Sequence, residues 1–207
     1  RWVIFMANTI ILVISLSLVI YGYIKLLITY ILNRDKKYKN KAYEVVIKLL
    51  DDESSINLIE SKESSFSKYN IKRKMVKLSE NTYDNDNIFR VSVASMLSGY
   101  ALSKSKYLKT LSTIFKELKV FSYSAIICII ISILTTNMGD AKISIVLVSL
   151  IAVYQYILNL INAEALDNVD VSKEVNGIMN TFNKVNNIFF ISSLVQIVRL
   201  VVIILNM

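Results

Sequence analysis

The sequence contains no histidine and no proline, and it has one cysteine and four glycines among its 207 residues. Without histidine there is no Ser-His or Cys-His nucleophile pair, and no His-ligated zinc, copper or non-haem iron site. The single thiol, Cys128, excludes an intramolecular disulfide and a cysteine-rich metal knuckle. These absences remove most of the common hydrolytic and metal chemistries, and no cofactor is expected.

Long apolar runs are what the sequence has instead. Hydrophobic residues make up 54% of the chain, and the mean hydropathy is +0.50. Three runs carry no charge, Trp2–Ile24, Val120–Gly139 and Ile143–Ala163, and a fourth, Ile188–Leu205, is interrupted only by Arg199. Because a bilayer core of about 30 Å needs roughly 20 helical residues, the sequence predicts about four transmembrane helices.

Charge is concentrated between the first and the second of these runs. Residues 34–119 hold 18 of the 24 basic side chains and 11 of the 16 acidic ones, so a net charge of +7 lies there. Lys and Arg beside membrane helices favour the cytoplasmic side, so this segment is expected in the cytoplasm with both chain ends outside. The same basic residues are expected to face membrane lipids, and their placement does not indicate a nucleic-acid partner.

The sequence therefore predicts a mainly α membrane protein with a small cytoplasmic α+β insert between the first two transmembrane helices. The predicted division is a transmembrane helix over residues 1–32, the insert over 33–118, a transmembrane hairpin over 119–163, a cytoplasmic loop over 164–187 and a fourth transmembrane helix over 188–207. Heavy use of isoleucine, lysine and asparagine is typical of an AT-rich genome. We expect a multi-pass protein of a bacterial plasma membrane.

Several elements are predicted within the insert. Lys39–Leu50 places apolar residues at helical spacing and predicts an amphipathic helix. Ser55–Ile59 and Arg73–Leu78 contain β-branched or alternating residues and predict two strands of a small hairpin or sheet. In Ile88–Leu102 only Arg90 is charged, so this stretch predicts a helix that is buried on most sides. Its small residues would allow close packing against other helices.

The stretch from Tyr69 to Leu102 resembles the core motif region of the membrane-bound neutral zinc metallopeptidases of the YugP-like family. The resemblance needs no gap and is carried by Tyr69, Val76, Leu78, Ser79, Tyr83, Val93, Ala94, Gly99 and Ala101. The order of elements agrees as well, from an N-terminal membrane helix through a basic linker to a membrane hairpin and a last span, so the resemblance covers essentially the whole chain. It implies a zincin-like insert in which residues 88–102 form the motif helix.

The positions that carry chemistry in that family are replaced in this chain. In the family's His-Glu-x-x-His helix the two His bind zinc and the Glu is the general base, and the resemblance maps these positions onto Met96, Leu97 and Tyr100. The third ligand, a Glu, maps onto Leu160 in the stretch Leu160–Glu164. The resemblance thus implies a degenerate site without zinc or catalytic residues, whose four side chains pack together as an apolar plug. The simpler alternative is that Met96 and Tyr100 are ordinary core residues.

The leading hypothesis is a catalytically inactive metallopeptidase homologue that acts as a membrane-embedded binding or scaffolding subunit. Zincin-type enzymes hold substrate along a strand edge, so a partner strand is expected to dock by β-augmentation along the predicted second strand. Candidate partner-binding residues are Arg73, Lys74, Met75, Val76, Lys77 and Leu78, together with Gln196 and Arg199 in the last span. Expected partners are another membrane protein, an active paralogue or a second copy of the chain.

Two other functions stay open. A subunit of a membrane transport or pore complex would be lined by Arg199, Gln196, Asn159 and Asn162. A small toxin-related or self-protection membrane protein agrees with the size and the basic charge alone. The simpler interpretation of Arg199 is a side chain that extends toward the nearer membrane surface.

Overall fold

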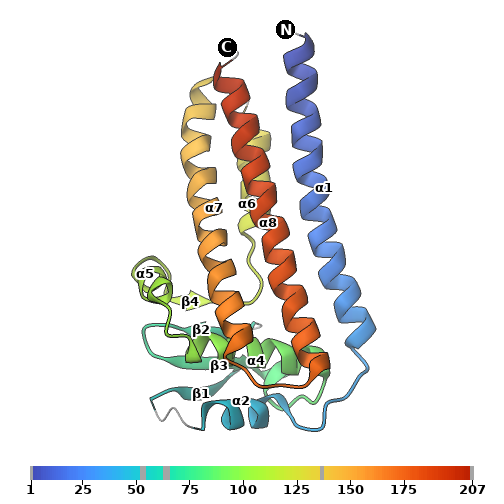
Figure 1. Cartoon of the computed structure of the whole chain (residues 1–207), viewed down its shortest axis with the longest axis vertical. Helices are drawn as coiled ribbons and strands as arrows, with labels where there is room; N and C mark the ends of the chain where they lie inside the picture. The colour runs from blue at the N-terminus through green and yellow to red at the C-terminus, as the bar shows by residue number, and fades with distance from the viewer. Residues whose placement is uncertain (1, 52–54, 63–65, 136–137, 206–207) are drawn as a thin grey trace. The chain divides into compact units, whose positions relative to one another are not determined.

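The protein is mostly helical, with a small sheet (Figure 1). The structure, a computed structural model, describes residues 2–51, 55–62, 66–135 and 138–205. Three of its helices are long and apolar enough to cross a membrane, namely α1 (Trp2–Asn33), α7 (Met138–Asp167) and α8 (Lys173–Leu205). Their length and composition are those of membrane spans.

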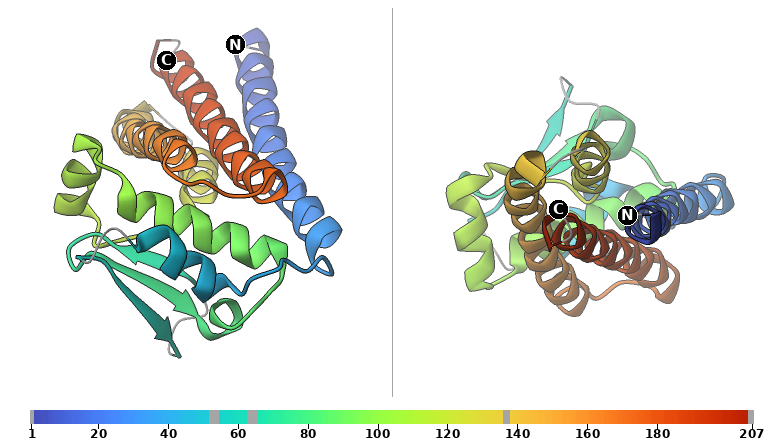
Figure 2. Two further views of the ribbon diagram at one scale, coloured as in Figure 1. Left: turned by 60° about the horizontal axis from the view of Figure 1, so that its bottom comes forward. Right: turned by 90° about the horizontal axis from the view of Figure 1, so that it is seen from above.

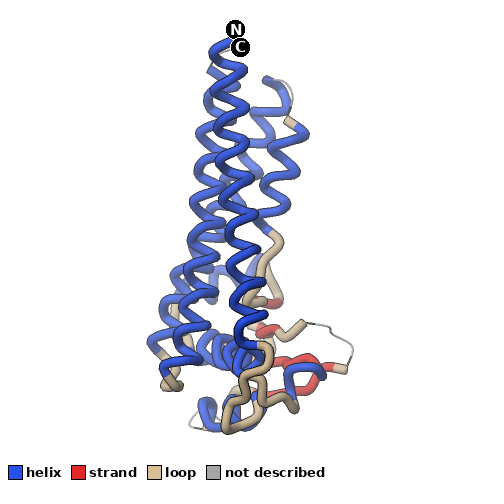
Figure 3. The backbone as a smooth tube through the Cα atoms, turned by 90° about the vertical axis from the view of Figure 1, so that its right-hand side faces the viewer, coloured by secondary structure: helices blue, strands red, loops and turns tan. Residues whose placement is uncertain are grey.

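The helix expected in the second charge-free run is shorter than predicted. α6 (Ser124–Leu134) has 11 residues, so it rises about 16 Å at 1.5 Å per residue, roughly half of a bilayer core of about 30 Å. The chain leading into α6 is a loop (Figure 3). There the ring of Phe121 packs against those of Phe89 and Phe182, with centroids 6.2 and 5.1 Å away. The described residues thus include three membrane-length helices rather than four.

The loop predicted over residues 164–187 is wrong. α7 continues to Asp167 and α8 already begins at Lys173, so only residues 168–172 connect them. The polar composition of this stretch hides a buried stripe with helical spacing, formed by Val175, Ile178, Met179 and Phe182. Such a stripe stabilises an amphipathic helix that is polar on its other face.

The chain folds into two compact units. The first contains the residues up to Leu26, Ser122–Asn159 and the residues from Lys184 onward, and hence α6 and parts of the three long helices. Its core consists of two apolar clusters: Val19, Ala125, Ile129, Val185 and Phe189 in one, and Cys128, Ala141, Val148, Leu200 and Ile203 in the other. The hydroxyls of Ser15 and Ser192 also lie 2.6 Å apart between α1 and α8.

The second unit contains Leu27–Phe121 and Leu160–Asn183. Its elements between α1 and α6 are α2 (Ala42–Leu50), β1 (Asn57–Ser61), β2 (Lys68–Asn70), β3 (Met75–Ser79), α3 (Glu80–Tyr83), α4 (Ile88–Leu102), α5 (Lys106–Ile114) and β4 (Glu117–Leu118). The strands form one sheet in the order β1-β3-β2-β4. α2 and α4 pack against each other and against this sheet (Figure 2). The amphipathic helix predicted at Lys39–Leu50 corresponds to α2, which buries Ala42, Val45, Val46 and Leu50.

The two predicted strands exist, but they do not form a hairpin. β1 and β3 pair in parallel, with Leu58 opposite Val76. The polar stretch between them contains β2, which pairs antiparallel with β3 on its other side. Tyr69 of β2 lies opposite Val76 and is buried. Burial of this ring favours a third strand in a segment whose composition predicts a loop.

Candidate functional site

The motif helix α4 is the most deeply buried helix of the second unit. Asn87 caps its N-terminus, because the side-chain Oδ1 accepts hydrogen bonds from the backbone N–H groups of Phe89 and Arg90, at 2.9 and 3.2 Å. Such a cap satisfies donors that the first helical turn leaves unpaired. Every residue from Ile88 to Tyr100 except Arg90 is buried. The helix therefore belongs to the interior of the unit along almost its whole length.

The three motif positions on α4 are sealed from solvent. Met96, Leu97 and Tyr100 are each 0% exposed. Met96 and Tyr100 are four residues apart, so helical geometry places them on the same face one turn apart. This is the spacing at which two zinc-binding histidines would project together. In this chain the same helix face carries the thioether of Met96 and the phenol of Tyr100 instead.

The phenol of Tyr100 is hydrogen-bonded inside the unit. Its hydroxyl donates to Oδ1 of Asn162 on α7 at 2.6 Å, and Asn162 is 1% exposed. Burial of a hydroxyl without a partner costs free energy, and the hydrogen bond to Asn162 offsets that cost for Tyr100. A neutral hydrogen bond thus joins the motif helix to α7.

Close backbone packing brings α4 and α7 together beside this bond. A Cβ built on Gly99 would lie 2.6 Å from the backbone oxygen of Ala165 and 2.7 Å from its Cβ. No larger side chain fits without a shift of one helix. Glu164 adds a further link, because its Oε1 accepts the backbone N–H of Lys104 at 3.0 Å, just beyond the end of α4.

Leu160 differs from the other predicted plug residues. Its side chain is only half-buried, and it precedes Asn162 by two positions, about 200° around the helix. The residue of α7 that contacts Tyr100 is therefore Asn162, whereas the assignment of Leu160 to the third ligand position stays a prediction. From the sequence, Asn162 is predicted only as a pore-lining residue. A side-chain amide in a long, largely apolar helix indicates a buried polar partner, but the sequence does not identify that partner.

The side chains at these positions do not fit a zinc ion. Zinc in proteins is bound by imidazole nitrogen, thiolate sulfur and carboxylate oxygen. At the two mapped ligand positions, Met96 offers only a thioether sulfur and the hydroxyl of Tyr100 is engaged by Asn162, while Leu97 at the general-base position has no polar atom. Within the described parts of the chain, no group of three or more His, Cys, Asp or Glu is placed to hold a metal ion.

The strand predicted to offer a docking edge lies in the middle of the sheet. β3 is hydrogen-bonded to β1 along one side and to β2 along the other, so the prediction of a free edge over Arg73, Lys74, Met75, Val76, Lys77 and Leu78 is wrong. Its apolar residues Val76 and Leu78 are buried, as a central strand requires. Arg73 and Lys74 precede the strand in a turn and are exposed.

A cavity of about 440 Å³ opens at the C-terminal end of α4. Lys74 and Lys104 line it together with Tyr69. Burial raises the pKa of the Tyr69 phenol above its ordinary value, because the charged phenolate loses its hydration. The cavity therefore combines two cations with a phenol that is neutral at physiological pH.

Gln196 and Arg199 lie in the first unit and are buried there. Nε of Arg199 donates to Oδ1 of Asn8 at 2.7 Å, and its Nη1 donates to the backbone oxygen of Ser132 at 2.6 Å. Arg199 thus contacts α1 and α6, and the simpler prediction that it extends to the membrane surface is not what its contacts show. The carboxamide of Gln196 has no hydrogen-bond partner among the described residues.

The other residues of the predicted pore path bond to neighbouring side chains. Asn186 donates to Oδ1 of Asn159 and to the backbone oxygen of Gln155, while Asn162 accepts from Tyr100 in the second unit. Interhelical hydrogen bonds of this kind hold membrane helices together. The contacts favour a structural role and give the pore hypothesis no support.

The family model described as "Putative neutral zinc metallopeptidase" matches residues 5–205. Neither a curated protein nor a solved structure matches the chain.

Proposed function

The chain belongs to the "putative neutral zinc metallopeptidase" family. We propose that it is a catalytically inactive member of this family that serves as a membrane-embedded binding or scaffolding subunit. The observation that supports this most is the complete burial of Met96, Leu97 and Tyr100. A zinc peptidase needs an open coordination position for water and access for a peptide. Side chains with no exposed surface offer neither.

The contacts around Tyr100 support the same proposal. A zinc ligand must leave its donor atom free for the metal, but the Tyr100 hydroxyl is bound to Asn162. The close approach of Gly99 to Ala165 leaves no room for an ion between the two backbones there. The family's scaffold is thereby retained as a packed interior that needs no metal for its stability.

Partner binding is proposed at the outer edge of the sheet. In the order β1-β3-β2-β4 the two edge strands are β1 and β4, and β1, with five residues against two in β4, offers the longer edge. An extended segment of a partner can add to such an edge through main-chain hydrogen bonds. Ile59 on β1 is 41% exposed and would contribute an apolar contact.

We further propose that the partner is membrane-bound, either another membrane protein, an active paralogue or a second copy of this chain. The three membrane-length helices support a chain that is embedded in a bilayer. The basic excess of residues 34–119 favours a cytoplasmic position for the sheet. Both observations support a partner that reaches the inner face of the same membrane.

The catalytic half of the proposal is tested with the purified full chain in mild detergent. Hydrolysis of casein and of a quenched fluorescent peptide library is measured with added zinc, with an intact His-Glu-x-x-His metallopeptidase as the positive control. No hydrolysis above the detergent blank is expected. Cleavage that zinc supports and a chelator abolishes would overturn the proposal.

The binding half is tested by site-specific photocrosslinking in intact membranes. A photoreactive residue at Ile59 on β1 is expected to crosslink to a membrane protein. The matched control is Ile47 on α2, which is similarly exposed but lies off the sheet edge. Equal crosslinking at both positions, or none at Ile59, would contradict docking at β1.

A further inference from the structure

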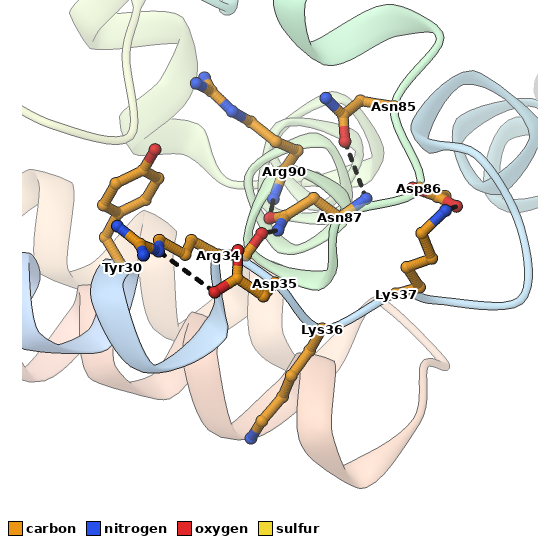
Figure 4. Close-up of a pocket in the computed structure, with 9 residues that line it drawn as sticks. All are labelled: Tyr30, Arg34, Asp35, Lys36, Lys37, Asn85, Asp86, Asn87 and Arg90. Carbon is orange, nitrogen blue, oxygen red and sulfur yellow. Dashed lines mark hydrogen bonds and ion pairs between the residues drawn. The ribbon is translucent and has the colours of Figure 1, made fainter.

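A second cavity, of about 370 Å³, lies where α1 ends and the chain turns toward the sheet of the second unit. Residues 30–37 form one side, and residues 85–90, around the start of α4, form the other (Figure 4). The cavity is separate from the motif positions on α4, and no function described above uses it.

Hydrogen bonds fix the two walls of this cavity. Nδ2 of Asn87 donates to the backbone oxygens of Asn33, at 3.0 Å, and of Arg34. The backbone N–H of Ile88 donates to the oxygen of Lys36 at 3.0 Å, and that of Tyr38 to the oxygen of Asp86 at 2.6 Å. The walls are therefore pre-organised, and a ligand would not have to order them.

The lining is basic. It contains Arg34, Lys36, Lys37 and Arg90 but only two acids, Asp35 and Asp86. Arg34 pairs with Asp35, and Lys37 with Asp86, each at 3.2 Å and with largely exposed side chains. Such surface pairs are weak and exchange readily for a stronger anion.

Of the four lining cations, Arg90 and Lys36 form no ion pair with any residue in the described part of the chain. In Figure 4 the guanidinium groups of Arg34 and Arg90 and the phenol of Tyr30 lie on one side of the view, whereas Lys37 turns to Asp86 on the other side and Lys36 points away. Two guanidinium groups and a hydroxyl form a set of donors that suits phosphate oxygens.

The helix that leads into the cavity is apolar on its outer surface almost to its end. Leu27, Ile28, Ile31 and Leu32 are all exposed, and Arg34 follows directly. Exposed apolar side chains of this kind are stable in contact with lipid chains. In a bilayer that covers these side chains, the cavity would begin at the depth of the lipid headgroups, where tyrosine and basic residues are enriched.

We propose that this cavity binds the phosphate of an anionic phospholipid headgroup. Arg34 and Arg90 donate charge-assisted hydrogen bonds to the phosphate oxygens, and the Tyr30 hydroxyl donates to the same headgroup. The lipid is preferred over free phosphate because the exposed apolar surface of α1 continues up to the cavity and holds the acyl chains beside it. The bound lipid links the C-terminal end of α1 to the N-terminal end of α4.

The test uses the purified full chain in detergent and native mass spectrometry. Retention of dioctanoyl phosphatidylglycerol is compared with that of dioctanoyl phosphatidylcholine and of inorganic phosphate. The variants are Arg90→Gln and Arg34→Gln, and the matched control is Arg73→Gln, which removes the same charge from an exposed turn outside the cavity. Far-ultraviolet circular dichroism confirms that each variant is folded. If Arg90→Gln does not fold, Arg34→Gln, which replaces an exposed side chain, still tests the site.

We expect preferential binding of phosphatidylglycerol, a loss of affinity of about tenfold or more in Arg90→Gln or Arg34→Gln, and no change in Arg73→Gln. Equal losses in the cavity variants and in Arg73→Gln would show attraction by net charge alone and overturn the site. Inorganic phosphate that binds as tightly as phosphatidylglycerol would overturn the lipid assignment. Equal retention of phosphatidylcholine and phosphatidylglycerol would overturn the requirement for an anionic headgroup.

Discussion

At the scale of single residues, one hydrogen bond accounts for how the interior of the second unit tolerates a phenol. Tyr100 and Asn162 are 62 positions apart in the chain and are joined at 2.6 Å. The sequence predicts that Tyr100 is buried, since the residues around it are apolar or small, but it does not identify the acceptor. Which amide meets which hydroxyl depends on how α7 packs against α4, and local sequence does not encode that packing.

Tyr100→Phe is expected to lower the free energy of unfolding by about 1–3 kcal/mol, because Oδ1 of Asn162 would stay buried without its donor. Combining it with Asn162→Leu removes both polar partners, so the double variant should recover much of that loss. Chemical denaturation in detergent micelles measures both values. Tyr107→Phe, on an exposed ring of α5, is the control and should change stability by less than about 0.5 kcal/mol. Equal effects of the two Tyr→Phe variants would contradict this role of the bond.

At the scale of the elements, the packing of α4 against α7 distinguishes Gly99 from Gly177. Gly99 on α4 faces Ala165 at distances below 3 Å for an added Cβ, whereas Gly177 on α8 has no atom within 4 Å of such a Cβ. The sequence predicts close packing for α4 from its run of small residues. It does not identify Gly99 as the point of contact, because neighbouring small residues fit the same pattern.

The two glycines predict opposite effects for the same substitution. Gly177→Ala should stabilise the protein by about 1 kcal/mol through helix propensity. Gly99→Ala should destabilise it by about 1–3 kcal/mol, since the added methyl overpacks the contact with Ala165. Thermal unfolding of both variants beside the parent chain provides the comparison. A stabilising Gly99→Ala would show that α4 and α7 are not in contact at this point.

The start of α2 predicts a dependence of stability on pH. The carboxylate of Glu44 accepts the backbone N–H of Lys41 at 3.0 Å and the side-chain N–H of Asn40 at 3.2 Å, and these bonds, the first above all, hold its pKa below the ordinary value. A carboxyl whose folded pKa is lowered stabilises the fold above its unfolded pKa of about 4.3 and loses that contribution as the pH falls through the folded pKa.

Glu44→Gln should therefore unfold at a lower temperature than the parent chain at neutral pH, and the difference should shrink in acid. Thermal scans from about pH 7 to pH 3 measure this difference across the titration. Glu60→Gln on the exposed strand β1 controls for the loss of one negative charge. A gap between Glu44→Gln and the parent that stays constant with pH would contradict the contribution of the charged form.

At the scale of the whole molecule, the sequence predicts what depends on local composition and misses what depends on contacts between distant segments. The apolar runs identify α1, α7 and α8 as membrane-length helices, because hydropathy and length are local properties. The shortness of α6 is not predicted, because Phe121 is held by rings from α4 and α8. The central position of β3 is missed for the same reason, since strand order depends on pairing partners.

The central claim for the molecule is that a family scaffold persists without its metal. Its most direct test is the zinc content of the purified full chain after dialysis against excess zinc and gel filtration, measured by inductively coupled plasma mass spectrometry. We expect no zinc above the buffer background and an unfolding temperature that zinc and chelators leave unchanged. One tightly bound zinc per chain, lost together with thermal stability when a chelator is added, would contradict it.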